Sequence, residues 1–227
     1  MNNEVIFFTH VACVILTVGI GMRGKVPFLG ILFCLFLWIS NLFVIKEIEC
    51  FGIVITTCDA YTVGSILCLN LIQEFKGKQE SRKWLYRGLA GLGIFVIMSR
   101  FQNLYQGADH SLEIENAFKT TLQYCTRIVT ASFVVTFLMD RLDMVIFNFL
   151  KSKWPLTDFS CRFLGSTLIS QLLDTILFTF IGLGGIIISP WSCILTAYIV
   201  KMSTILLMGT LFFLAKKWIY NPLKSNI

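Results

Sequence analysis

Long apolar runs, separated by short polar or charged segments, make up most of this chain. A helix needs about 20 mostly apolar residues to cross the hydrocarbon core of a membrane. The pattern therefore predicts an all-α membrane protein, a bundle of seven transmembrane helices, with six as the alternative. The seven runs are approximately Val5 to Ile20, Pro27 to Ile45, Phe51 to Ile72, Leu85 to Leu104, Phe118 to Leu150, Phe163 to Ile188 and Ser192 to Trp218.

Composition supports this class. The chain is 56% hydrophobic and only 14% charged, with a mean hydropathy of +0.77, whereas soluble domains carry about 25% charged residues. No hydrophilic block is long enough for a second domain. We expect one polytopic domain, 1–227, in which residues 5–21 form an accessory N-terminal helix and 27–218 the core bundle.

The charged segments indicate how the chain is oriented. Basic residues follow the first run, so it resembles a retained helix more than a cleaved signal peptide. Seven spans would put Arg23, the basic segment 76–87, which is expected to be a loop, the pair Lys151 and Lys153, and the Lys-rich C-terminal tail on one side. The segment 106–115 carries acids and is expected to be an exposed loop on the other side. By the positive-inside rule, the N-terminus is outside and the C-terminus cytoplasmic. The net charge of +6 is then a topology signal and does not indicate a nucleic-acid partner.

The sixth run has the most informative polar pattern. Thr167, Ser170, Gln171, Asp174 and Thr175 recur at helical spacing, so they share one face of a helix, while Leu, Ile and Phe cover the other. We expect the apolar face to contact lipid. A carboxylate in mid-span costs about 2.5 to 3.5 kcal/mol on insertion scales and usually marks a substrate or ion path. Asp174 is therefore the first site candidate, with a helix-packing hydrogen bond as the alternative.

Other polar residues fall inside predicted spans. Asn70 and Glu74 are one turn apart on the third helix, which also carries Asp59, although Glu74 is equally explained as an interfacial carboxylate. Arg127 is at spanning depth and is expected to pair with Asp174 or Asp59. Lys201 is a second buried cation, with a structural ion pair as its alternative role.

The fifth run is longer than one span needs. We expect it to be tilted, kinked or projecting, with 140–150 extending into the cytoplasm. One side of this helix is predicted to carry Gln123, Arg127, Thr130, Val134, Arg141 and Asn148, so Arg127 and the acids of the other side are expected to have different partners. Asp140 and Asp143 lie roughly opposite, where a solvated role is one of two alternatives.

The residues offer no catalytic motif. No nucleophile and base stand at a defensible spacing, and no Gly-rich loop has the form of a phosphate cradle. The eight cysteines are scattered through the apolar segments, without CxxC or Cys/His grouping, and are interpreted as small packing residues. We therefore expect no enzyme activity, no metal and no cofactor.

Several short motifs occur along the chain in a fixed order: Asn41 with Lys46-x-x-Glu49, Leu69 to Gly77, Arg127 to Ser132, Asp143-x-x-x-Phe147, Ser166-Thr-Leu-x-x-Gln-x-x-Asp174-Thr, and Lys201. In this order they resemble the queuosine precursor transporter family, earlier named vitamin uptake transporters. The resemblance covers about residues 27–218. The family usually has Asp where this chain has Asn70, and often Gln where it has Asp140.

The resemblance implies uptake of 7-deazaguanine compounds, such as the cyano and aminomethyl precursors or queuine, across the bacterial cytoplasmic (inner) membrane for tRNA modification. The implied partners are a small nucleobase precursor and membrane lipid, with no nucleic acid, and a homo-oligomer is left open. The alternatives are a substrate-binding subunit of an energy-coupling vitamin importer and, in another class, a lipid-modifying membrane enzyme. The expected substrate-binding residues are Asp174, Gln171, Asn70, Glu74, Lys201, Arg127, Asp59, Phe178, Asn41 and Asp143.

Overall fold

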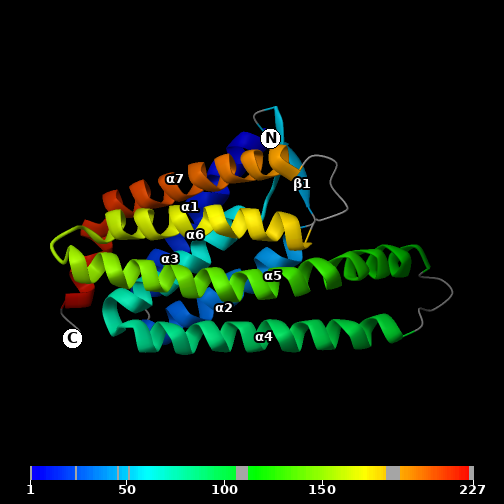
Figure 1. Cartoon of the computed structure of the whole chain (residues 1–227), viewed down its shortest axis with the longest axis horizontal. Coiled ribbons are helices and arrows are strands. Elements are labelled where there is room, and N and C mark those ends of the chain that lie inside the picture. Colours follow the sequence, from blue (N-terminus) through cyan, green and yellow to red (C-terminus); the bar gives the residue numbers. More distant parts are fainter. Residues whose placement is uncertain are drawn as a thin grey trace.

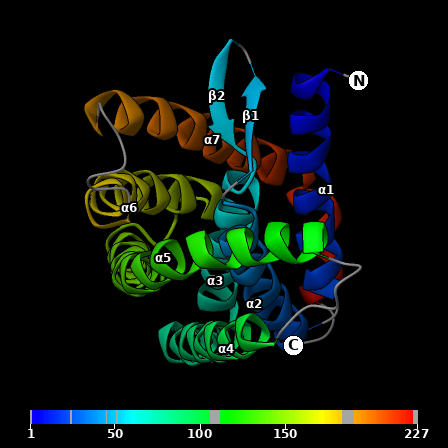
Figure 2. The same ribbon diagram turned by 90° about the vertical axis from the view of Figure 1, so that its right-hand side faces the viewer.

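The computed structural model describes residues 2–23, 25–44, 46–50, 52–105, 112–182 and 190–224. Helices α4, α5 and α6 lie along the long axis of the molecule in Figure 1. Figure 2 shows α4, α6 and the later part of α5 nearly end-on, whereas the first part of α5 runs across the view. Within the described residues the elements are α1 Asn3–Arg23, α2 Lys25–Phe43, β1 Glu47–Cys50, β2 Ile53–Thr56, α3 Asp59–Lys76, α4 Lys78–Leu104, α5 Leu112–Lys153, α6 Phe159–Gly182 and α7 Pro190–Lys224.

The helical membrane class agrees with the sequence prediction. Four segments of the described residues are long and apolar enough to cross a membrane, Asn3–Met22, Val26–Phe43, Phe159–Gly182 and Cys193–Thr210. No such segment is found among the described residues of α3, α4 and α5. The predicted number of seven spans therefore stays a prediction.

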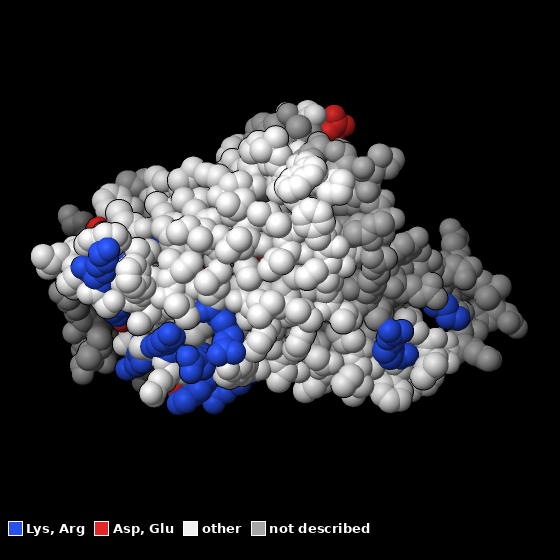
Figure 3. All heavy atoms as spheres, in the orientation of Figure 1, with Lys and Arg blue, Asp and Glu red and all other residues white. Residues whose placement is uncertain are grey.

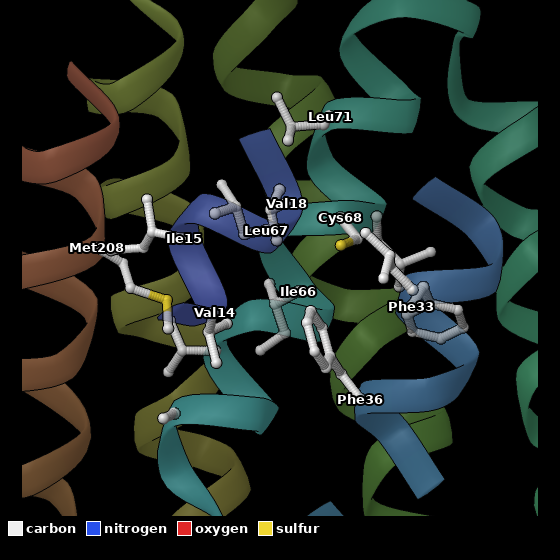
Figure 4. Packing of buried hydrophobic residues seen from close by; sticks show 14 of the residues in the cluster. Val14, Ile15, Val18, Phe33, Phe36, Ile66, Leu67, Cys68, Leu71 and Met208 are labelled. Carbon is white, nitrogen blue, oxygen red and sulfur yellow. The ribbon is translucent and has the colours of Figure 1, made fainter. Parts of the chain in front are cut away.

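Helix α3 explains how a polar helix is accommodated in such a bundle. It contacts each of the other six helices, and 13 of its 18 residues are buried. A helix shielded from lipid on all sides can carry polar residues at little cost, because they face protein. Its apolar side chains, Ile66, Leu67 and Leu71 among them, meet those of α1, α2 and α7 in the main hydrophobic core, which Figure 4 shows from close by.

A β-hairpin replaces the beginning of the predicted third span. Strands β1 and β2 pair antiparallel, with Glu47 opposite Thr56 and Cys50 opposite Ile53. Gly52, at φ +72°, makes the turn, a conformation that costs glycine little. Asn3 donates a hydrogen bond from Nδ2 to the Glu49 carbonyl at 2.7 Å, which ties the hairpin to the start of α1. The prediction of one span from Phe51 to Ile72 was wrong, because α3 begins only at Asp59.

The basic segment 76–87, predicted as a loop, is mostly helical. Only Gly77 separates α3 from α4, and its positive φ of 84° lets the chain reverse within one residue. Ser81 then donates to the Leu69 carbonyl at 3.1 Å, which holds the first turn of α4 against α3. Residues 106–111 of the predicted acidic loop lie outside the described residues, and α5 begins at Leu112.

The length of α5 was predicted, but not where its extra residues lie. Asp140, Met144 and Phe147 are all buried, and Gln73 of α3 donates to the Met144 carbonyl at 2.9 Å. This part of the helix is therefore packed within the bundle and does not project. Figure 1 shows instead that the first part of α5 and the last part of α4 extend beyond the ends of α6 and α7.

Helices α2 and α4 are joined by glycines that face aromatic rings. Gly30 of α2 lies against Trp84 of α4, and Gly91 of α4 lies against Trp38 of α2. Trp38 also donates from Nε1 to the Gly88 carbonyl at 3.0 Å. Small residues let helices approach closely where no hydrophobic effect drives their association in lipid, so these contacts set the spacing of the two helices.

We expect Gly30→Ala to lower stability by about 1 to 3 kcal/mol, the usual cost of overpacking. A methyl group there would lie 2.1 Å from Trp84 Cδ2, inside the ring's van der Waals envelope. Thermal unfolding in detergent, followed by tryptophan fluorescence, measures the effect. The matched control is Gly93→Ala in α4, where an added Cβ meets nothing within 4 Å, so equal melting temperatures for the two variants would contradict the prediction.

Candidate functional site

Helix α6 presents its polar face to the bundle, as the sequence predicted. Thr167 and Ser170 are completely buried, and Gln171 and Thr175 are 2% and 3% exposed. Ile169, Leu172 and Phe180, on the other side, are exposed. This distribution is the inverse of that of a helix on a water-soluble protein, and it places a polar surface at the centre of a membrane bundle.

An ion pair links α6 to α7 at the middle of this face. Lys201 Nζ lies 2.5 Å from Asp174 Oδ2, with side chains 12% and 15% exposed. Nearby, Tyr198 donates from its hydroxyl to the Leu168 carbonyl at 3.3 Å, a second link between the two helices. Asp59, the first residue of α3, is buried and lies close enough to Lys201 and Asp174 to interact with both charges. Three helices thus bring two carboxylates to one ammonium group.

The expected partner of Asp174 was Arg127 rather than Lys201. Arg127 lies in α5 among residues whose side chains the structure does not describe, so its expected role stays untested. Asp174 and Lys201 were both predicted as interior charges among two acids and two bases that balance one another, and the structure pairs them directly.

A second polar group surrounds Asp143 of α5. Ser170 donates from Oγ to Asp143 Oδ1 at 3.0 Å, and Ser166, Thr167 and Asn70 lie around the same carboxylate. Asp140, one turn earlier, is 5% exposed and Asp143 is 2% exposed. The solvated alternative for these two acids is therefore wrong.

The side of α5 that carries Arg141 faces outward wherever the structure describes its side chains. Val134, Arg141 and Asn148 are exposed, and the Arg141 guanidinium lies over the ring of Phe137, 5.3 Å from its centroid. The acids on the opposite side are the inward ones. The sequence periodicity separated the two faces correctly but did not indicate which one faces the bundle.

Several buried polar atoms next to these acids have no hydrogen-bond partner among the described residues. They are Oδ1 and Nδ2 of Asn70, Oε1 of Gln171, Oγ1 of Thr167 and Oδ2 of Asp140. Asn70 and Thr167 lie beside Asp143 without meeting hydrogen-bond geometry to it. An unsatisfied buried polar group costs about 1 to 3 kcal/mol, so a cluster of them is characteristic of a surface that contacts a ligand.

Glu74 does not belong to this group. Its Oε1 is 2.8 Å from Arg162 of α6 and its Oε2 is 3.2 Å from Lys151 of α5. Arg162 also donates to the Thr157 carbonyl at 2.8 Å. The cluster holds three helices together near the end of α3. Sequence analysis missed Arg162, which is 88 residues from Glu74. The signal was present, because an arginine at the start of an apolar run needs a carboxylate partner.

Two further residues that were expected to bind substrate lie at the margin of this interior polar region. Asn41, near the end of α2, is 3% exposed and donates from Nδ2 to the Leu37 carbonyl of its own helix at 2.8 Å. Phe178 lies one turn after Asp174, is partly buried and packs beside Gly182. The structure therefore brings Asp174, Lys201, Asp59, Gln171, Asn70 and Asp143 into the interior of the bundle.

Comparison with known proteins identifies the family. The model of the family described as "Putative vitamin uptake transporter" matches residues 60–215. A "Probable queuosine precursor transporter" of Bacillus subtilis (strain 168) is 26% identical over 238 residues, which span 99% of this chain and 99% of that protein. No solved structure gives a significant match. The family match runs from the second residue of α3 to residue 215 in α7, and the chain is a multi-pass membrane transporter that belongs to the vitamin uptake transporter family.

Proposed function

We propose that this transporter imports 7-deazaguanine precursors of queuosine across the bacterial cytoplasmic membrane. The observation that carries the proposal is the Asp174–Lys201 pair, together with the amide of Asn70 and the Oε1 atom of Gln171, which are buried in the same bundle without hydrogen-bond partners among the described residues. Together they present a carboxylate, an ammonium group and two amides in one buried region. The likeness over the full chain to a probable queuosine precursor transporter of Bacillus subtilis supports the same class of substrate.

The chemistry of the base matches these groups. The N1–H and 2-amino groups of a 7-deazaguanine are adjacent donors, and one carboxylate can accept from both. Asp174 uses Oδ2 for Lys201, so in the proposal the base competes with Lys201 for this carboxylate. The 6-oxo group is an acceptor, which the amide of Gln171 or Asn70, or the Lys201 ammonium, can satisfy. A site built for these hydrogen bonds rejects analogues that lack them.

Asp59 can compensate the charge of Lys201 when the base binds. If the base takes the place of Lys201 at Asp174, the buried ammonium group loses part of its ion pair, and an unpaired buried charge is costly. Asp59 of α3 lies close enough to the same ammonium group to interact with its charge, so it can form the ion pair in place of Asp174. The proposed role of Asp59 is therefore to keep Lys201 paired while Asp174 binds substrate.

The proposed orientation has all seven helices spanning, with the N-terminus outside and the C-terminus in the cytoplasm. Figure 3 shows Lys and Arg side chains gathered over the end where α4 begins and α5 ends, with fewer at the opposite end. Exposed members of this basic end are Arg82, Lys83 and Lys153. The positive-inside rule places such an end in the cytoplasm, and the hairpin then lies outside.

We expect a cysteine at position 49 to react with a membrane-impermeant maleimide in intact cells, and one at position 79 to react only after lysis. Glu49 is exposed on the hairpin, and Gln79 is exposed at the start of α4. Because Cys13 and Cys161 are also exposed, both variants, Glu49→Cys and Gln79→Cys, are made in a cysteine-free background. Labelling of position 79 from outside would reject the orientation.

The uptake experiment uses a strain that cannot make queuosine precursors and lacks its own importer. Expression of this chain alone is expected to restore queuosine in tRNA when 7-cyano- or 7-aminomethyl-7-deazaguanine is supplied. A substrate-binding subunit of an energy-coupling importer would bind the precursor but need a separate ATPase for uptake. Binding by the purified chain without uptake by the strain would therefore favour that alternative.

A further inference from the structure

We propose that the acids Asp140 and Asp143, together with oxygens of Asn70, Thr167 and Ser170, form a sodium site that is coupled to substrate binding. Two carboxylates one turn apart on α5 are buried at 5% and 2% exposure. Neither has an ion pair with a cation among the described residues, whereas Asp174 and Glu74 both have one. The inference deepens the proposed function and, in its coupling step, rests on it.

Buried carboxylates require compensation, because burial of an unpaired charge is far more costly than burial of a paired one. The charged groups that face Asp140 are Asp143 and Asp174. Lys201 is already bonded to Asp174 and faces Asp59 as well. The groups around Asp143 are the neutral hydroxyls of α6 and the Asn70 amide of α3. A bound cation would supply the missing positive charge.

The unpartnered atoms indicate which cation fits. Apart from the amide nitrogen of Asn70, they are oxygens: Asp140 Oδ2, Asn70 Oδ1, Thr167 Oγ1 and Gln171 Oε1. A proton would satisfy one carboxylate oxygen and leave the others without a partner. Hard cations take several oxygen ligands of mixed type, carboxylate, carbonyl and hydroxyl. Secondary transporters place their coupling-ion sites near the middle of the membrane, and the inward Na⁺ gradient of many bacteria can drive uptake.

The amide of Asn70 connects this site to the substrate. When the oxygen of Asn70 faces the cation, its amide nitrogen is directed away from it and is free to donate to the 6-oxo group of a 7-deazaguanine. Gln171, on the polar face of α6, also has a buried oxygen without a partner, Oε1, but it is not one of the proposed sodium ligands. Sodium would thus fix the orientation of the Asn70 amide, which the base needs, so the two ligands should bind cooperatively and reciprocally.

The test uses the purified full-length chain with NaCl, KCl or choline chloride at equal ionic strength. The first readout is thermal unfolding without any substrate, and the second is binding of labelled 7-cyano-7-deazaguanine. We expect Na⁺, but not K⁺ or choline, to raise the melting temperature. We also expect Na⁺ to tighten substrate binding by about 5- to 150-fold, the usual range of coupling between two sites.

The variant Thr167→Val removes one proposed ligand and keeps the shape of the side chain. It is expected to raise the Na⁺ concentration for half-maximal stabilisation by about fivefold or more. Thr204→Val is the matched control, since Thr204 is also fully buried but its hydroxyl donates to the Val200 carbonyl of its own helix at 3.0 Å. Asp140→Asn serves as a second test of the same site and should abolish the stabilisation by Na⁺.

The outcomes separate the two proposals. Stabilisation by Na⁺ that Thr167→Val weakens and Thr204→Val retains supports the site, even if no 7-deazaguanine binds and the proposed function fails. Substrate binding that is equal in all three salts, without stabilisation by Na⁺, overturns the sodium site and leaves the proposed function standing. Uptake that follows a proton gradient in Na⁺-free medium would also overturn it, and would assign Asp140 and Asp143 a shared proton.

Discussion

Replacing Arg162 with Gln is expected to destabilise the folded protein by about 3 kcal/mol, the lower end of the cost of removing one partner of a buried ion pair. Arg162 is 6% exposed and contacts Glu74 at 2.8 Å, and its loss leaves that carboxylate with Lys151 alone. Lys151 is 36% exposed and lies at 3.2 Å, so it is a weaker partner. Thermal unfolding in detergent measures the effect.

Two variants test the cause of this loss. Arg82→Gln removes an exposed cation of α4 and should change stability by less than about 0.5 kcal/mol. The double variant Glu74→Gln with Arg162→Gln should regain part of the loss, because no unpaired carboxylate then remains. If the double variant is as unstable as the sum of the two single variants, then Arg162 acts through its contact with the Thr157 carbonyl and not through the ion pair.

The sequence predicted best where one helix meets two different environments. On α6, the alternation of Thr167, Ser170 and Gln171 with Ile169 and Leu172 has the period of a helix, and burial follows it. The same reasoning separated the two sides of α5. It could not choose between them, because a short polar side chain such as Asp143 and a long cation such as Arg141 are both polar in the pattern. Which of the two sides faces the bundle is decided only by the packing of α5 against α3 and α6.

The errors in the sequence analysis have related causes. The hairpin was missed because its second strand, Ile53–Thr56, is as apolar as a membrane helix and joins α3 after only two residues. The partner of Glu74 was missed, and Arg127 was named before Lys201 as the partner of Asp174, because each pair joins residues far apart in sequence, 88 and 27 positions. Periodicity places a residue on a face of a helix, whereas a pair depends on how two helices are docked.

The largest effect on transport is expected for Asp174→Asn. The substitution keeps the size of the side chain but replaces one carboxylate oxygen with the NH₂ of an amide. In the proposed site, that group would be a donor facing the donors of the guanine edge. Binding of 7-cyano-7-deazaguanine should fall by about 5- to 150-fold, equivalent to the 1 to 3 kcal/mol of an unsatisfied buried group. Equilibrium binding to the purified variant and uptake by the precursor-requiring strain measure the effect.

A structural role for Asp174 would give the same loss, because the substitution also leaves Lys201 next to an uncharged amide. Two comparisons distinguish these explanations. If Asp174 only neutralises Lys201, the double variant Asp174→Asn with Lys201→Gln should recover binding, whereas a carboxylate that contacts the base cannot be replaced in this way. The native protein should also bind 7-deazaguanine more tightly than 7-deazahypoxanthine, which lacks the 2-amino group, and Asp174→Asn should remove most of that difference. A well-folded Asp174→Asn protein that still distinguishes the two bases would show that another group reads the 2-amino edge, and Asp59, the other carboxylate beside Lys201, would then be the residue to test.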